Sequence, residues 1–110
     1  MEVEGRNEFG LTGREMKTIM AIFDKYREVE EVRIFGSRAK GNYQNGSDID
    51  LAISNVLGSE WVVLRLKEDF EESSLPYFVD IVYLPLLQHL ELRGHIERVG
   101  KVFYSKVAFA

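Results

Sequence analysis

The chain has 110 residues, of which 45% are hydrophobic and 29% charged, and its formal net charge is −4. This length suits a single globular domain, and the acidic balance argues against extended nucleic-acid binding, which leaves a basic surface. The absence of cysteine excludes disulfides and thiolate metal sites. No apolar stretch approaches the ~18 residues of a membrane span, and the polar N-terminus is unlike a signal peptide. We therefore expect a cytoplasmic protein.

The first half of the chain predicts a helix followed by a strand. Residues 1–11 are expected to be a flexible lead-in, and Thr12-Gly13-Arg14-Glu15 matches the capping box that begins a helix. Apolar residues follow at helical spacing and predict one buried stripe: Met16, Ile19, Met20, Phe23 and Tyr26. Residues 31–35 are β-branched and aromatic enough to predict a strand. Residues 36–41 predict a turn that can include a single turn of helix.

The second half predicts an alternation of strands and helices. After the tight-turn pair Asn45-Gly46, strands are expected at 48–53 and 77–84, with a helix capped by Ser59 at 59–72 between them. Residues 86–99 predict a helix that ends at Gly100, and 102–104 a short last strand. One domain is therefore expected over 12–104, with a tail at 105–110.

This order of elements predicts an α/β (α+β) fold of two layers, in which helices cover one face of a small mixed sheet. Asp48, Asp50 and Asp80 then belong to the opposite face or its rim. Three carboxylates cannot all stay ionised in a dry core without compensation. The sequence thus predicts that this face is wet, metal-bound or both.

The pair Asp48 and Asp50 opens the second predicted strand. Residues two apart on a strand point the same way, so their Cα atoms should lie about 7 Å apart on one face. Mutual repulsion raises the pKa of each carboxyl, and a hard cation such as magnesium would relieve it. Such a pair alone is more often solvated surface.

The pair Gly36-Ser37, directly after the first predicted strand, favours a functional site over solvated surface. A glycine permits a close backbone approach, and a hydroxyl with a free N–H at a turn suits a phosphate. A P-loop is excluded because Asn42 and Tyr43 replace its Lys and Ser/Thr. Arg38 and Lys40 are each as compatible with neutralising phosphate as with a solvated turn.

Taken together, Gly36-Ser37, the ten residues before Asp48-Ile49-Asp50, and the later Asp80 form a specific pattern. It resembles the nucleotidyltransferase superfamily that includes DNA polymerase β and kanamycin nucleotidyltransferase, and the chain is similar to its minimal nucleotidyltransferase (MNT) group over roughly residues 12–104. The resemblance implies the nucleotidyltransferase fold and ATP as substrate. It also implies that Asp48, Asp50 and Asp80 hold two Mg²⁺ ions and act in catalysis, while Gly36 and Ser37 bind the β- and γ-phosphates.

The short remainder of the chain has no room for the second lobe that presents the acceptor in larger relatives, so we expect a partner protein. The resemblance implies a helical HEPN protein, an RNase toxin, on which the transferase places AMP on a tyrosine and so acts as antitoxin. Two alternatives stay open. One is a non-catalytic module that neutralises or assembles with a HEPN partner, and the other is transfer to a small molecule of the aminoglycoside type. Each of these functions is compatible with a homo-oligomer or a hetero-oligomer.

Overall fold

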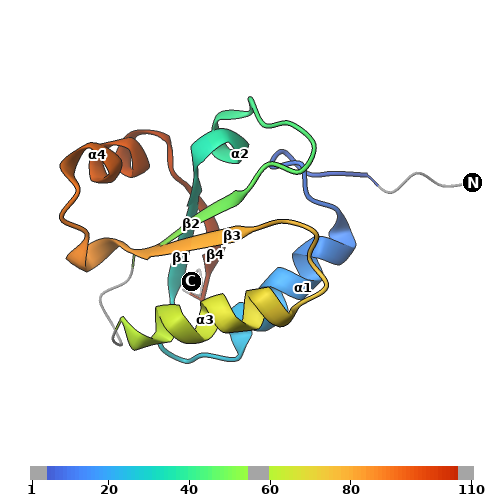
Figure 1. Cartoon of the computed structure of the whole chain (residues 1–110), viewed down its shortest axis with the longest axis horizontal. Helices are drawn as coiled ribbons and strands as arrows, with labels where there is room; N and C mark the ends of the chain where they lie inside the picture. The colour runs from blue at the N-terminus through green and yellow to red at the C-terminus, as the bar shows by residue number, and fades with distance from the viewer. Residues whose placement is uncertain (1–4, 55–59, 107–110) are drawn as a thin grey trace, which may run out of the picture.

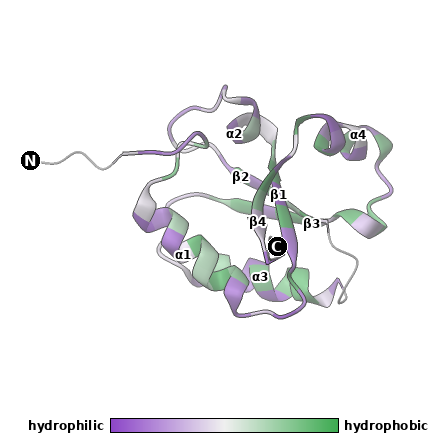
Figure 2. Ribbon diagram, turned by 180° about the vertical axis from the view of Figure 1, so that it is seen from behind, coloured by the Kyte–Doolittle hydropathy of each residue, from purple (hydrophilic) through white to green (hydrophobic). Residues whose placement is uncertain are grey.

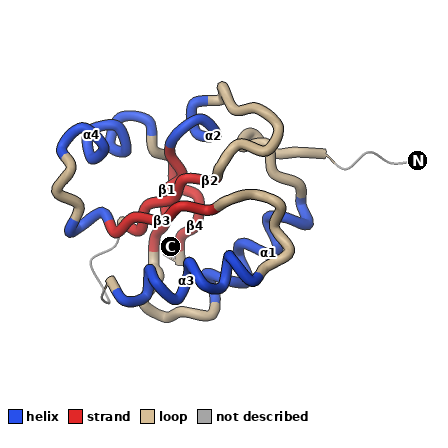
Figure 3. Tube along the Cα trace, viewed as in Figure 1, coloured by secondary structure: helices blue, strands red, loops and turns tan. Residues whose placement is uncertain are grey.

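The computed structural model describes residues 5–54 and 60–106 and has a four-stranded sheet with helices on both sides (Figure 1). The elements, shown by type in Figure 3, are α1 (Gly13–Asp24), β1 (Glu31–Phe35), α2 (Gly36–Lys40), β2 (Ile49–Ile53), α3 (Trp61–Glu72), β3 (Val79–Tyr83), the 3₁₀ turn η1 (Leu84–Leu86), α4 (Leu90–Val99) and β4 (Lys101–Ser105). The predicted mixed α/β class is confirmed. Among the described residues no helix is long and apolar enough to cross a membrane.

The strands lie in the order β3-β2-β1-β4. β1 is antiparallel to both of its neighbours, β2 and β4, whereas β2 and β3 are parallel. Parallel strands need a long crossover connection, and α3 supplies it between β2 and β3. This crossover places β3 at one edge of the sheet, with the start of β2 beside the start of β3.

The main core lies between the sheet and the pair α1 and α3, below the sheet in Figure 1. The inward side chains alternate along β1, β2 and β3, as a half-buried strand requires. Figure 2 shows hydrophobic residues along the strands and a mixture of both kinds around the helices. The fully buried strand residues of this face are Val32, Ile34, Ile49, Leu51, Ile53 and Ile81.

The fold differs from the sequence expectation in the position of α4, which packs on the opposite face rather than beside α1 and α3. Its buried Ile96 contacts Phe35 of β1 and Ala52 of β2 in a second apolar cluster. Leu92 and Val99 join it, because spacings of three and four residues place them on one helix face. The face that carries the aspartates is therefore partly covered.

Several element boundaries also differ from prediction. The helix expected at 86–99 begins only at Leu90, as α4, after the 3₁₀ turn η1 that ends at Leu86. His89 caps α4 by accepting a hydrogen bond from Leu92 N–H at its Nδ1 atom (3.1 Å). α3 begins at Trp61, and the predicted cap Ser59 lies outside the described residues. Near the N-terminus, Phe9 and Leu11 are buried in the main core, so the residues directly before α1 pack onto the domain.

The predicted start of α1 is confirmed in detail. Thr12 Oγ1 accepts a hydrogen bond from Glu15 N–H (3.1 Å), and Glu15 Oε1 accepts one from Thr12 N–H (2.9 Å). We expect Thr12→Ala to lower the free energy of unfolding by about 1 kcal/mol because the Glu15 N–H loses the side-chain oxygen that accepts its hydrogen bond. Thr12→Ser keeps the hydroxyl and should stay close to wild type in urea denaturation. Equal stability of the alanine and serine variants would contradict this role.

Candidate active site

The structure places two of the predicted aspartates directly opposite each other. Asp50 of β2 and Asp80 of β3 are register partners in the parallel pair. Neighbouring strands lie about 4.8 Å apart, so the two side chains leave the same face of the sheet side by side. Asp48 is exposed and lies one residue before β2 begins. The parallel crossover through α3 thus brings together carboxylates that are 30 residues apart in the sequence.

The environment of Asp50 disfavours its ionised form. Burial first, and then the negative charges of Asp80 and Asp48, raise the pKa of Asp50 to about 6. No described lysine or arginine forms an ion pair with these three groups. The site therefore concentrates negative charge without a protein cation, which is an arrangement that favours binding of a metal ion.

On its other side, Asp50 faces the end of β1 and the start of α2. Phe35 is its partner in the antiparallel pair, and the next residue, Gly36, has a positive φ of 73°. A Cβ atom at Gly36 would collide with Asp50 Oδ2. Ser37 follows in α2 and is half-buried. Gly36 is thus the residue type that this close approach requires.

The donor set fits magnesium because it consists of hard carboxylate oxygens. Within residues 5–54 and 60–106, no three acidic or histidine side chains are gathered into a complete cation site. Magnesium typically takes only one or two carboxylates from a protein and completes its shell with water and substrate phosphates. The geometry therefore suits an ion that arrives with a nucleotide better than a resident structural ion.

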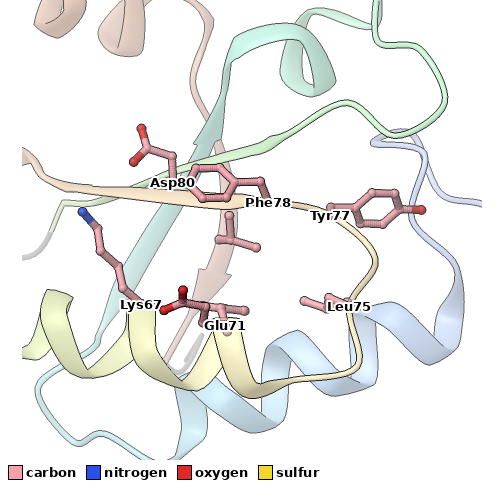
Figure 4. A pocket seen from close by; sticks show the side chains of 8 residues that line it. Lys67, Glu71, Leu75, Tyr77, Phe78 and Asp80 are labelled. Atoms are coloured by element: carbon pink, nitrogen blue, oxygen red, sulfur yellow. The ribbon is translucent and has the colours of Figure 1, made fainter.

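A hollow of about 350 Å³ lies beside Asp80, between β3 and α3 (Figure 4). Asp80 of β3 and Phe78, the residue before that strand, line one side, and Lys67 and Glu71 of α3 line the other. Phe78 is 68% exposed, so its ring is not packed against the sheet. Sequence patterns did not indicate this hollow, because it depends on how α3 packs against the edge strand.

Neither role considered for Arg38 applies, because this side chain is only 2% exposed. Its guanidinium donates hydrogen bonds to backbone carbonyls, and it is therefore neither a solvated turn residue nor a free phosphate ligand. Lys40, two residues on, is exposed. The sequence around Gly36-Ser37 does not indicate which of the two basic residues that follow is buried and which is exposed.

The raised pKa of Asp50 predicts a pH-dependent stability of the metal-free protein. The folded pKa lies above the ordinary value of 3.8, so the ionised carboxylate destabilises the fold, and this cost appears as the pH rises from about 4 through about 6. Asp50→Asn mimics the protonated form and should be more stable than wild type at pH 8 by about 1 kcal/mol, after allowance for solvent screening. At pH 4 the two proteins should differ little. Thermal unfolding in a chelator at both pH values measures this, and a gain that is independent of pH would contradict it.

Carboxylates on two adjacent strands, facing a glycine turn at the end of a third, define the class of enzymes that transfer nucleotidyl groups. Residues 17–108 match the family model described as polymerase beta, nucleotidyltransferase. The chain belongs to this nucleotidyltransferase family, and its substrate is accordingly a nucleotide.

Known relatives agree with this assignment. The chain is 34% identical over 76 residues to the probable protein adenylyltransferase MntA of Haemophilus influenzae. The matched residues are 68% of this chain and 67% of the relative. Its fold is similar to a chain in the crystal structure of a toxin–antitoxin with AMP-PNP, with a TM-score of 0.65, 22% identity, and coverage of 83% of this chain and 73% of that one. It is also similar to a chain of a tri-AMPylated Shewanella oneidensis HEPN toxin in complex with an MNT antitoxin, with a TM-score of 0.59, 20% identity, and coverage of 83% and 70%.

Proposed function

We propose that the protein transfers AMP from ATP to a tyrosine of a HEPN partner and so acts as the antitoxin of a toxin–antitoxin pair. The observation that carries the proposal is the position of Asp50 between Asp80 on one side and Gly36 on the other. A relative of 34% identity is named as a protein adenylyltransferase. A structure of similar fold contains an AMPylated HEPN toxin with an MNT antitoxin.

In this proposal, Asp48 and Asp50 would hold Mg²⁺ that arrives with ATP, and Asp80 would contribute to the site of a second ion. Bound magnesium would stabilise the charge that develops on the attacking and leaving oxygens. Gly36 and Ser37 bind the β- and γ-phosphates, since only a residue without a side chain leaves room beside Asp50. Because the carboxylates lack a protein cation, the positive charge must come with the substrate.

The chemical step is an in-line substitution at the α-phosphorus. The tyrosine oxygen forms a bond to this phosphorus while the bond to the bridging oxygen of the β-phosphate breaks, and pyrophosphate leaves with that oxygen. The phenol proton passes to a carboxylate, for which Asp80 is placed at the open edge strand. The use of ATP and a sequence without cysteine are consistent with a cytoplasmic location.

The main competing function is binding without catalysis. In a growth assay that co-produces a HEPN toxin, the double variant Asp48→Asn, Asp50→Asn should fail to neutralise the toxin although it still binds it in a pull-down. Intact mass spectrometry of the toxin should show added AMP with wild type only. If the double variant protected cells as well as wild type, the protein would act as a binding module.

A further inference from the structure

We propose that Arg38 is the positioning residue that holds Asp48 at a fixed distance from the phosphate-binding turn. The inference rests on the proposed function, because it concerns how the same site is assembled. Arg38 is the third residue of α2, the helix that begins with Gly36 and Ser37. Its contacts lead to the loop that carries Asp48.

The guanidinium joins two segments that are separate in the sequence. Its Nε and Nη2 atoms donate to the carbonyl oxygen of Ser47, at 3.0 and 2.8 Å, and Nη1 donates to the carbonyl oxygen of Phe9 at 2.8 Å. Ser47 immediately precedes Asp48. The two bonds to Ser47 therefore hold the peptide group between Ser47 and Asp48 in place. The third bond connects Arg38 to the N-terminal loop, which runs beside the loop of Asp48 (Figure 1).

Two aromatic rings enclose the same guanidinium. Its central carbon lies 4.4 Å from the centre of the Tyr77 ring and 5.4 Å from that of Tyr43. In the described part of the chain no carboxylate forms an ion pair with Arg38, so carbonyl dipoles and ring faces balance its charge. Tyr77 lies two residues before β3, the strand of Asp80. The buried side chain of Arg38 thus connects α2, the helix that begins at Gly36, to the segments next to Asp48 and Asp80.

Lysine cannot reproduce this arrangement, although it keeps the charge. An ammonium is a point donor, whereas the planar guanidinium donates in two directions in a fixed geometry. Arg38→Lys should therefore fold but release the Ser47 carbonyl. Asp48 then loses its fixed position, and substitutions that disturb the support of a metal ligand typically weaken metal binding or activity by roughly 10–100-fold.

Two measurements on Arg38→Lys test the inference, with Val63→Ala as a control that is destabilised in the core near the start of α3, beside Tyr83. First, hydrogen–deuterium exchange of residues 42–48 should accelerate in Arg38→Lys and stay at the wild-type rate in Val63→Ala. Second, the Mg²⁺ concentration that gives half-maximal AMP transfer should rise roughly tenfold in Arg38→Lys and remain unchanged in the control. Arg38→Ala should show larger effects if it folds.

Two results would overturn the inference. Unaltered exchange of residues 42–48 in Arg38→Lys would show that the loop does not depend on the guanidinium. A raised KM for ATP with an unchanged Mg²⁺ requirement would instead make Arg38 a phosphate ligand. The exchange measurement needs no activity, so inactive wild-type protein would contradict the proposed function and leave this test intact.

Discussion

Asp50→Asn is expected to reduce AMP transfer by roughly 10²–10³-fold or more, the range for loss of one preorganised electrostatic group in an active site. Asp50 is the carboxylate next to both Asp80 and Gly36, so it links the proposed metal ligands with the proposed phosphate-binding turn. Neutral asparagine keeps the shape but provides one weaker oxygen ligand for a cation. The initial rate of transfer at saturating ATP measures the effect.

The same substitution separates catalysis from folding, because it should raise rather than lower the stability of the metal-free protein at pH 8. A loss of activity in a more stable protein cannot be attributed to unfolding. Glu72→Gln is a matched control, since it removes one exposed carboxylate at the end of α3, in the layer on the other side of the sheet. It should leave transfer at the wild-type rate. An active Asp50→Asn variant would refute the assignment of this residue.

Gly36→Ala is expected to reduce transfer by roughly 10²-fold, the scale of a 1 Å misplacement of reacting groups. The added methyl group would collide with the Asp50 carboxylate, and the positive φ of 73° is unfavourable for alanine. The backbone term alone costs roughly 1–2 kcal/mol of stability. The loss of activity should exceed what this destabilisation explains, because the carboxylate must move. Transfer rates measured well below the unfolding temperature give the comparison.

Gly41 provides the control for this variant. It also has a positive φ, 87°, but a Cβ atom there would meet no atom within 4 Å. Gly41→Ala therefore imposes similar backbone strain at the other end of α2 without touching Asp50. We expect a similar loss of stability and nearly unchanged transfer. Equal losses of activity in both alanine variants would mean that strain in α2, rather than the approach to Asp50, limits the enzyme.

Local signals in the sequence predicted the elements that local chemistry determines. The capping box at Thr12 and the strand at 31–35 were confirmed at the predicted positions, because caps and β-branched runs act within a few residues. The pattern of Gly36-Ser37, Asp48, Asp50 and Asp80 also indicated the family, which the family comparison confirmed over residues 17–108.

Features that depend on distant contacts were not predictable in this way. The periodicity of residues 86–99 indicated a helix, yet nothing in it specified that α4 would pack against Phe35 and Ala52 on the aspartate face. The burial of Arg38 depends on carbonyl groups that become neighbours only after folding, those of Phe9 and Ser47. For the same reason, the register of Asp50 with Asp80 followed from strand pairing and could not be read from spacing.

The central claim is that the protein breaks the bond between the α- and β-phosphates of ATP and passes AMP to a protein acceptor. The most direct measurement is to incubate the protein with Mg²⁺, a HEPN partner and ATP labelled either at the α- or at the γ-phosphate. Nucleotidyl transfer predicts that the partner gains the α-label while the γ-label leaves as pyrophosphate, and that Asp50→Asn abolishes both. Transfer of the γ-label to the partner, or no transfer of either label, would contradict the account.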